Sequence, residues 1–177
     1  MAHQRSRRNA GPRATRAFLA GGAVAVAARA VVPRALATKL RRDVARLNEG
    51  DYGPLLRGFA DDAVLHFNDG EHRWAGTHAG KEQIERFLQE FVAAGLQGRV
   101  GRIWLGGPPW ALELVVEFQD EARAPDGTTI YANRTLLWAR TRWGKIVEQR
   151  DYYEDTGRIV ELERALTELG IAASAGR

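Results

Sequence analysis

One stretch decides how this chain folds: Trp143 to Thr156, which reads W-G-K-I-V-E-Q-R-D-Y-Y-E-D-T. Gly144 and Lys145 form a short turn after the apolar run 135–139, and residues 146–153 continue in extended form, so the sequence predicts a β-hairpin. Side chains alternate between the two faces of a strand. The more apolar face of the second strand carries four alternate residues: Val147, Gln149, Asp151 and Tyr153. Asp151 is therefore expected to point toward an apolar pocket.

Outward from this hairpin, the sequence predicts helices first and strands afterwards. A first helix over residues 33–50 is indicated by an apolar stripe, whose members are Leu36, Leu40, Val44 and Leu47. The other expected helices cover residues 55–59, 81–94 and 158–169. The expected strands cover residues 63–67, 99–105, 110–118, 130–142 and 146–153. Helices followed by a meander of strands indicate an α+β fold.

Composition limits the classes of function. The chain has 177 residues, enough to bury one sizeable core in one domain. It has no cysteine, which excludes thiolate metal sites and cysteine nucleophiles. Its four histidines are scattered, so we expect no metal site and no cofactor.

The net charge of +4 is distributed unevenly along the chain. Residues 1–50 contain eleven basic residues and only two acidic ones, Asp43 and Glu49. A basic tail can bind nucleic acid. This one lacks interleaved aromatic residues and a recognisable reading helix, so we expect no nucleic-acid partner.

Residues 1–35 are predicted to form a basic, Ala-rich segment of their own, before a domain over residues 36–170 and a tail over residues 171–177. Arginines precede the apolar run 17–28, which resembles the outline of a secretory signal but is too short to span a bilayer. A helix that packs on the domain and an anchor at a membrane surface are the alternatives. We expect a cytoplasmic protein, with export or membrane association as the alternative.

Four segments together resemble the SnoaL-like branch of the nuclear transport factor 2-like superfamily. They are D-V-A-R-L-N-E-G-D-Y (Asp43 to Tyr52), F-A-D-D-A-V (Phe59 to Val64), A-G-T-H-A-G-K-E-Q-I (Ala75 to Ile84) and the stretch from Trp143 to Thr156. The likeness spans about residues 40 to 169. It implies a curved mixed sheet wrapped around the N-terminal helices, in the form of a cone with an open apolar pocket. Members include cyclases, isomerases, epoxide hydrolases and non-catalytic binding domains, so the fold alone does not choose a function.

The resemblance limits which family chemistry can apply. Ketosteroid isomerases have a carboxylate base at the position that aligns with Phe67, so their mechanism is not implied. Limonene epoxide hydrolases have an acid in a segment that resembles residues 149–155, where it matches Asp151. Their other two catalytic residues align around Glu117 and Gln119, which do not match. What remains is a role for Asp151 as general base in a SnoaL-like cyclisation or isomerisation, which needs a pKa raised by burial.

The candidate ligand-binding residues come from three places. On the neighbouring strand, Asn133 and Thr135 align on the same side as Asp151 and could hold a carbonyl or enolate oxygen. The loop after the first strand contributes a cluster that could grip an anionic or aromatic ligand, namely His72, Arg73 and Trp74. The set is completed by Phe67, Gln149 and Tyr153.

Each assignment has a structural alternative. Asp151 could pair with Arg134 or Arg150, and Trp74 could pack against the third helix. The expected function is therefore a domain that binds a small hydrophobic molecule, with acid–base catalysis by Asp151. The alternative is a non-catalytic ligand-sensing or dimerisation module. Leu136 and Trp138 would be exposed on the outer sheet face of a monomer, so we also expect a homodimer.

Overall fold

The computed structural model describes residues 34–173. The chain divides into two units, Met1–Leu36 and Ala37–Arg177, and only the second is considered below. The N-terminal segment predicted over residues 1–35 lies almost wholly outside the described residues. No helix within residues 34–173 is both long and apolar enough to cross a membrane.

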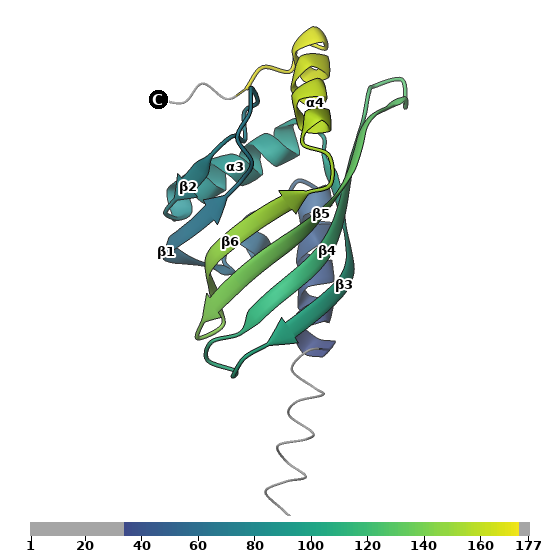
Figure 1. Ribbon diagram of the computed structural model, residues 1–177. Helices are drawn as coiled ribbons and strands as arrows, with labels where there is room; N and C mark the ends of the chain where they lie inside the picture. The colour runs from purple at the N-terminus through teal and green to yellow at the C-terminus, as the bar shows by residue number, and fades with distance from the viewer. Residues whose placement is uncertain (1–33, 174–177) are drawn as a thin grey trace, which may run out of the picture. The chain divides into compact units, whose positions relative to one another are not determined.

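The fold is α+β, as predicted, and its centre is a curled, open sheet (Figure 1). The strands are β1 (Phe59–His66), β2 (Thr77–Ala79), β3 (Gln97–Gly106), β4 (Glu113–Arg123), β5 (Thr129–Arg142) and β6 (Lys145–Tyr153). Their order across the sheet is β2-β1-β6-β5-β4-β3. The pair β1 and β6 is parallel, and all other neighbours are antiparallel. The first long strand therefore lies beside the last one.

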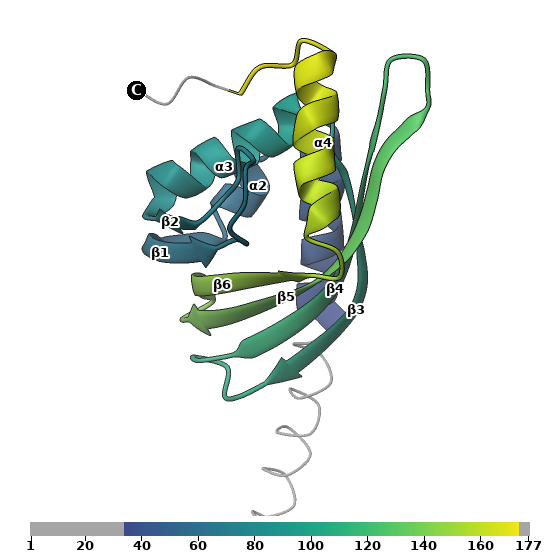
Figure 2. The same cartoon turned by 45° about the horizontal axis from the view of Figure 1, so that its top comes forward.

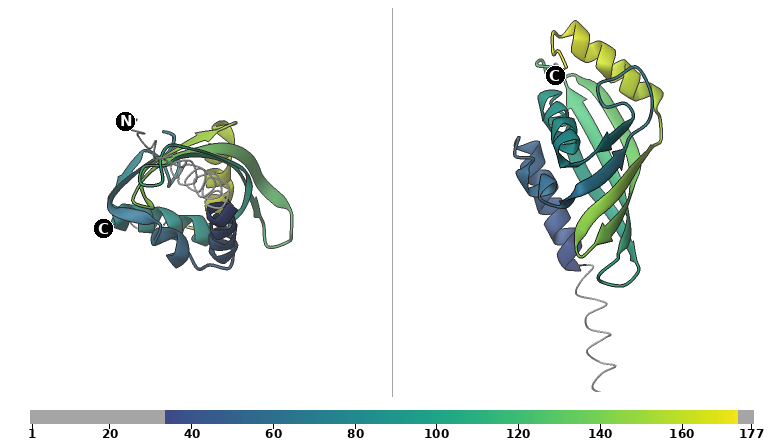
Figure 3. Two further views of the ribbon diagram at one scale, coloured as in Figure 1. Left: turned by 90° about the horizontal axis from the view of Figure 1, so that it is seen from below. Right: turned by 90° about the vertical axis from the view of Figure 1, so that its left-hand side faces the viewer.

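Helices cover the concave face of this sheet, as Figures 2 and 3 show. They are α2 (Gly53–Leu56), α3 (Lys81–Ala93), α4 (Gly157–Glu168) and the helix that ends at residue 48. The side-chain amide of Asn48 both donates to the carbonyl oxygen of Gly98 (2.9 Å) and accepts from its N–H (2.8 Å). This double hydrogen bond fixes the end of the first helix to β3.

The core lies between the helices and the sheet, because each element presents one apolar face there. The stripe of the first helix buries Val44 and Leu47, and α3 buries Ile84 and Phe91. From the sheet, alternate residues of each strand point inward. On α4 the buried residues recur at helical spacing: Ile159, Leu162 and Leu166.

The predicted hairpin is confirmed, with Arg142 paired to Lys145 across the Trp143–Gly144 turn. Both turn residues have positive φ, 52° and 77°, as a tight two-residue turn requires.

One detail of the predicted alternation is wrong. The register shifts so that Val147 has no partner on β5, and this bulge places Ile146 rather than Val147 against the core.

The first strand also differs from its prediction. It begins at Phe59, four residues earlier than expected, so Asp61 and Asp62 belong to the strand. Their exposed carboxylates pair with Lys81 and Arg142. The short strand β2 was not predicted, because three residues carry too little alternation to be recognised.

Candidate functional site

The helices and the concave sheet face enclose a cavity of about 100 Å³. Fourteen of its seventeen lining residues are apolar, and they come from both the helices and the strands. The three polar ones are Gln149, Asp151 and Tyr153, all from β6. The alternation of one strand thus places every polar group of this cavity on a single line.

Asp151 is held in this cavity with one polar partner. Gln149 Nε2 donates a hydrogen bond of 2.9 Å to Asp151 Oδ1. Arg150 and Arg134, the two arginines considered as partners, instead bind Glu148 and Glu154. No ion pair joins Asp151 to a cation within residues 34–173. Burial raises the pKa of Asp151 to about 7, the Gln149 hydrogen bond opposes this, and the nearby charge of Asp120 adds to it.

A second buried carboxyl group, Asp120 of β4, was missed by the sequence analysis. It is only 4% exposed. Its Oδ2 accepts hydrogen bonds from the hydroxyls of Tyr153 (2.9 Å) and Tyr131 (3.4 Å), while its Oδ1 is buried without a partner. Burial raises the pKa of Asp120 to about 7 because it outweighs these two hydrogen bonds. Burial and the charge of Asp120 also raise the pKa of Tyr153 well above its usual value.

The signal for Asp120 was present in the sequence. The inward face of β4 carries five alternate residues: Leu114, Val116, Phe118, Asp120 and Ala122. This is the same pattern, an acid in an apolar row, that singled out Asp151. Comparison with epoxide hydrolases drew attention to Glu117 and Gln119 instead, and these belong to the opposite face of the strand.

A model of the SnoaL-like domain matches residues 40–149, more than half of the chain. The chain belongs to the SnoaL-like family. No curated protein matches its sequence. Its family and its fold are therefore established by the domain model and by solved structures.

Three solved structures illustrate the shared fold. TerC, co-crystallised with polyporic acid, is 20% identical and covers 75% of this chain and 98% of its own, with a TM-score of 0.56. A nuclear transport factor 2-like protein from Burkholderia pseudomallei is 17% identical over 71% of this chain and 95% of its own, with a TM-score of 0.56. A candidate isomerase from Bacillus subtilis is 19% identical over 76% and 92%, with a TM-score of 0.55. At these identities the likeness shows the fold alone.

In this SnoaL-like domain, the two candidates on β5 lie beside the cavity rather than on its wall. Asn133 is buried, and its Nδ2 donates to the carbonyl oxygen of Asp155 (2.6 Å), which ties β5 to the start of α4. Thr135 is opposite Tyr153 in the sheet, and its buried hydroxyl has no hydrogen-bond partner in the described structure. Of these two residues, Thr135 is the one whose side-chain hydroxyl is left without a hydrogen bond to the protein.

Aromatic side chains of the SnoaL-like domain gather next to Tyr153. The ring of Phe67 contacts the rings of Tyr153 (5.1 Å between centroids), Phe87 (5.3 Å) and His72 (5.6 Å). Trp74 is 2% exposed and belongs to the core, as its structural alternative required. Burial lowers the pKa of His72, and neither of its ring nitrogens has a hydrogen-bond partner. Phe67 and Trp74 line a second, smaller cavity of about 10 Å³, which Asp120 and Tyr153 also line.

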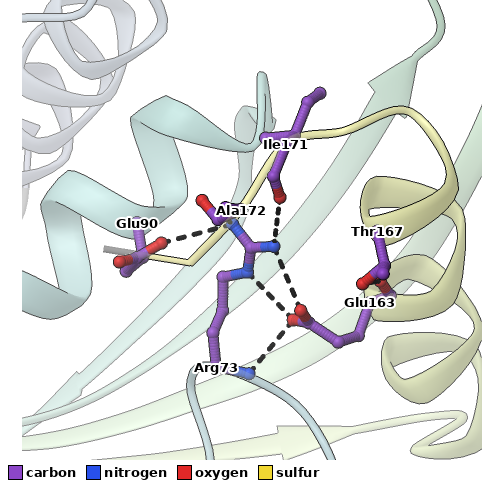
Figure 4. Close-up of polar contacts among 6 residues, drawn as sticks. All are labelled: Arg73, Glu90, Glu163, Thr167, Ile171 and Ala172. Atoms are coloured by element: carbon purple, nitrogen blue, oxygen red, sulfur yellow. Dashed lines mark hydrogen bonds and ion pairs between the residues drawn. The ribbon is translucent and has the colours of Figure 1, made fainter. Parts of the chain in front are cut away.

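Arg73 is fully engaged by protein groups (Figure 4). Its guanidinium binds both carboxylate oxygens of Glu163 (2.9 and 3.0 Å), reaches Glu90 (3.3 Å) and donates to the carbonyl oxygen of Ile171 (2.8 Å). Its backbone N–H also donates to Glu163. Because the side chain is 2% exposed, this arginine holds the loop, α3, α4 and the segment after α4 together. These contacts leave it no free donor with which to grip a ligand.

No group of three or more metal-binding side chains is present among residues 34–173 of the SnoaL-like domain. The polar groups on the wall of the cavity are one amide, one carboxyl and one hydroxyl group. The structure brings Gln149, Asp151 and Tyr153 together, adds Asp120 behind them, and places Arg73 and Trp74 in structural contacts.

Proposed function

We propose that this SnoaL-like domain binds a small, mainly hydrophobic molecule in its cavity and that Asp151 exchanges a proton with it. One observation carries the proposal: a carboxyl group without a cationic partner lies on the wall of an otherwise apolar cavity. A buried acid of this kind weakens a fold, so its presence is expected where it serves a site.

The chemistry follows from the environment of Asp151. A general base works best when its pKa lies near the working pH, and burial brings that of Asp151 to about 7. The carboxylate would remove a proton from a carbon next to a carbonyl group, giving a neutral acid and an enolate, and would return the proton to complete an isomerisation. The candidate isomerases among the similar folds agree with this class of reaction.

Hydrogen exchange of a simple ketone tests both parts of the proposal. The full chain is mixed with cyclohexanone in D₂O, and loss of the α-proton signal is followed by proton NMR. We expect exchange above the buffer rate, and a decrease of about 100-fold or more of that excess in Asp151→Asn. Binding is followed by shifts of the amide signals of β6.

A matched variant separates binding from chemistry. Leu137 lies opposite Asp151 in the sheet and lines the cavity, so Leu137→Phe fills the space beside the acid and leaves its carboxyl group in place. This variant should lose both binding and exchange, whereas Asp151→Asn should keep binding. Binding with no excess exchange in the native protein would assign the domain to the non-catalytic alternative, and absence of both would remove the proposal for this class of ligand.

We also propose that two copies associate through the outer face of the sheet. Large apolar side chains are exposed there, including Trp104 (49%), Leu136 (46%) and Tyr152 (58%). Leu136 and Tyr152 are direct neighbours across β5 and β6. In the adjacent row of the sheet, Trp104 lies opposite Val115, and Val115 lies opposite Trp138. Together the two rows form an apolar patch over four strands, bordered by Glu117 and Arg150. Such a patch is more than a scatter of single exposed residues, and a second copy would cover it.

A further inference from the structure

Asp120 lacks the partner that a buried carboxylate needs. An ionised carboxylate has room for about four hydrogen bonds. Asp120 receives two, both on Oδ2 and both from neutral tyrosine hydroxyls, and its buried Oδ1 receives none. No ion pair joins it to a cation in the described part of the chain. A buried charge without a cation is costly, whereas the neutral acid is not.

The surroundings of Asp120 add no compensating charge. Around the small cavity that it lines, α3 and α4 contribute only apolar side chains: Phe91, Ile159 and Leu162. The titratable groups are Tyr131 of β5, together with Tyr153 and Asp151 of β6.

The cations of the neighbouring elements are engaged elsewhere. Arg158, at the start of α4, donates to the carbonyl oxygen of Ala132 and pairs with Asp155. Arg73, from the loop, is engaged by Glu163 and Glu90. On β3 the residue opposite Asp120 is Gly98, which has no side chain. Arg99 and Arg134 line an outer pocket together with Asp120, but they bind Gln119 and Glu154. No cation within residues 34–173 therefore pairs with Asp120, and the nearby acid Asp151 adds a like charge.

We propose that Asp120 is the second functional carboxyl of the site and that its protonation state sets the direction of the Tyr153 hydroxyl. A hydroxyl group can donate or accept, so the 2.9 Å contact between Tyr153 Oη and Asp120 Oδ2 serves either direction. When Asp120 is ionised, the Tyr153 hydroxyl donates its hydrogen bond to the Asp120 carboxylate. When Asp120 is protonated it donates to Tyr153 Oη, and the tyrosine proton is free for a ligand.

This arrangement specifies the class of ligand. Tyr153 lines the cavity beside Asp151, so its free proton would meet a hydrogen-bond acceptor, such as a carbonyl oxygen, close to the base. The inference rests on the proposed function for its ligand, which is a small apolar molecule with one carbonyl group. Asp120 itself is a positioning residue, because it acts through Tyr153.

Titration of the ligand-free protein tests the core of the inference. In the full chain labelled with ¹³C at the aspartate carboxyl carbons, NMR should show two carboxyl groups that titrate near pH 7. Asp120→Asn should remove one of them and lower the midpoint of Asp151, because the repelling charge is gone. Tyr153→Phe should raise the midpoint of Asp120, because a donor to its charged form is lost.

An exposed acid provides the matched control: Asp126→Asn should leave both midpoints unchanged. If Asp120 titrates near the ordinary value of about 4, or if Asp120→Asn leaves Asp151 unmoved, the inference is overturned. The reciprocal variant, Asp151→Asn, keeps the test independent of whether Asp120→Asn folds. It should lower the midpoint of Asp120. None of these outcomes depends on ligand binding, so failure here is distinct from failure of the proposed function.

A pair of probes then tests the role of Tyr153. Cyclohexanone and methylenecyclohexane have nearly the same shape, but only the ketone accepts a hydrogen bond. The ketone should bind about fivefold more weakly above the Asp120 midpoint than below it, as expected for loss of one hydrogen bond. The hydrocarbon should show no such change, and Tyr153→Phe should remove the difference. Equal pH dependence for both probes would exclude the hydroxyl as the ligand's donor.

Discussion

Asp151 has one polar partner, the amide of Gln149, and faces a cavity whose other walls are hydrocarbon. The residue-scale consequence is a conflict between stability and chemistry. Burial that brings the pKa of this carboxyl to about 7 makes it a useful base and makes its charged form unfavourable in the fold. The unfolded chain has no such conflict, since its aspartates ionise near pH 4.

The free energy of unfolding should therefore depend on pH through Asp151. Between about pH 4 and pH 7 the folded state binds more protons than the unfolded one, so this group's contribution becomes less favourable as pH rises and levels off above the folded pKa. We expect Asp151→Asn to unfold at higher urea concentration at pH 8, with a gain of about 1 to 3 kcal/mol that disappears near pH 4.

The exposed acid Asp61 is the control for this measurement, and Asp61→Asn should change stability by less than about 0.5 kcal/mol at every pH. A loss of about 1 to 3 kcal/mol in Asp151→Asn would instead show that the carboxylate is a structural partner. That result would end its assignment as a base.

Strand alternation was enough to single out Asp151, because an aspartate in an apolar row is visible in the sequence. Asp120 lies in a similar row, but the strand predicted over residues 110–118 ended before it, whereas β4 continues to Arg123. What alternation cannot supply is the partner of each acid. Glu148 attracts Arg150, and Glu154 attracts Arg134, so neither arginine reaches Asp151. The contact of Asp120 with Tyr153 joins residues 33 positions apart on strands that are not adjacent in the sheet. Such contacts depend on how the sheet curls, and the periodicity of the sequence does not encode that curl.

At the scale of elements, long periodic segments were predicted well and short ones were not. Three of the four strands after α3 and the three longer helices lie within about two residues of their expected places. The fourth strand, β4, was expected over residues 110–118 and runs from Glu113 to Arg123. The other errors fall on β1, β2 and α2, which are short or irregular. Their conformation is set by neighbours: β1 extends toward Phe59 because that residue pairs with Ile146 of the last strand.

Arg73 shows how a loop can be fixed by side chains from distant elements. Replacing it with Met would leave the Glu163 carboxylate, 19% exposed, without its donors. We expect Arg73→Met to lower the free energy of unfolding by about 2 to 4 kcal/mol, measured by urea denaturation. The second change Glu163→Leu should recover part of this loss, because it removes the stranded charge.

Arg86 serves as the matched control, since it pairs with Glu82 on the exposed face of α3. Arg86→Met should cost less than about 0.5 kcal/mol. If Arg73→Met were equally mild, the guanidinium would not be structural, and its assignment as a ligand-binding group would return.

For the whole molecule, the exposed outer sheet face predicts association. The full chain should have twice its 19.6 kDa mass in light scattering at micromolar concentration. Leu136→Glu places a charge inside the apolar patch and should give a monomer. Leu169→Glu, at a similarly exposed leucine that follows the last residue of α4 (43%), should remain a dimer. A monomeric mass for the native chain would remove the proposal.

The place of β1 beside β6 has a consequence for the order of synthesis on the ribosome. When residues up to α3 have emerged, β1 has only the three-residue β2 to pair with, and the inner faces of the first helices have no sheet to cover. The parallel partner comes 84 to 87 residues later, and the carbonyl groups that bind Arg73 come later still, at residues 171 and 172. Folding must therefore wait for nearly the whole domain, and its early half needs protection during translation.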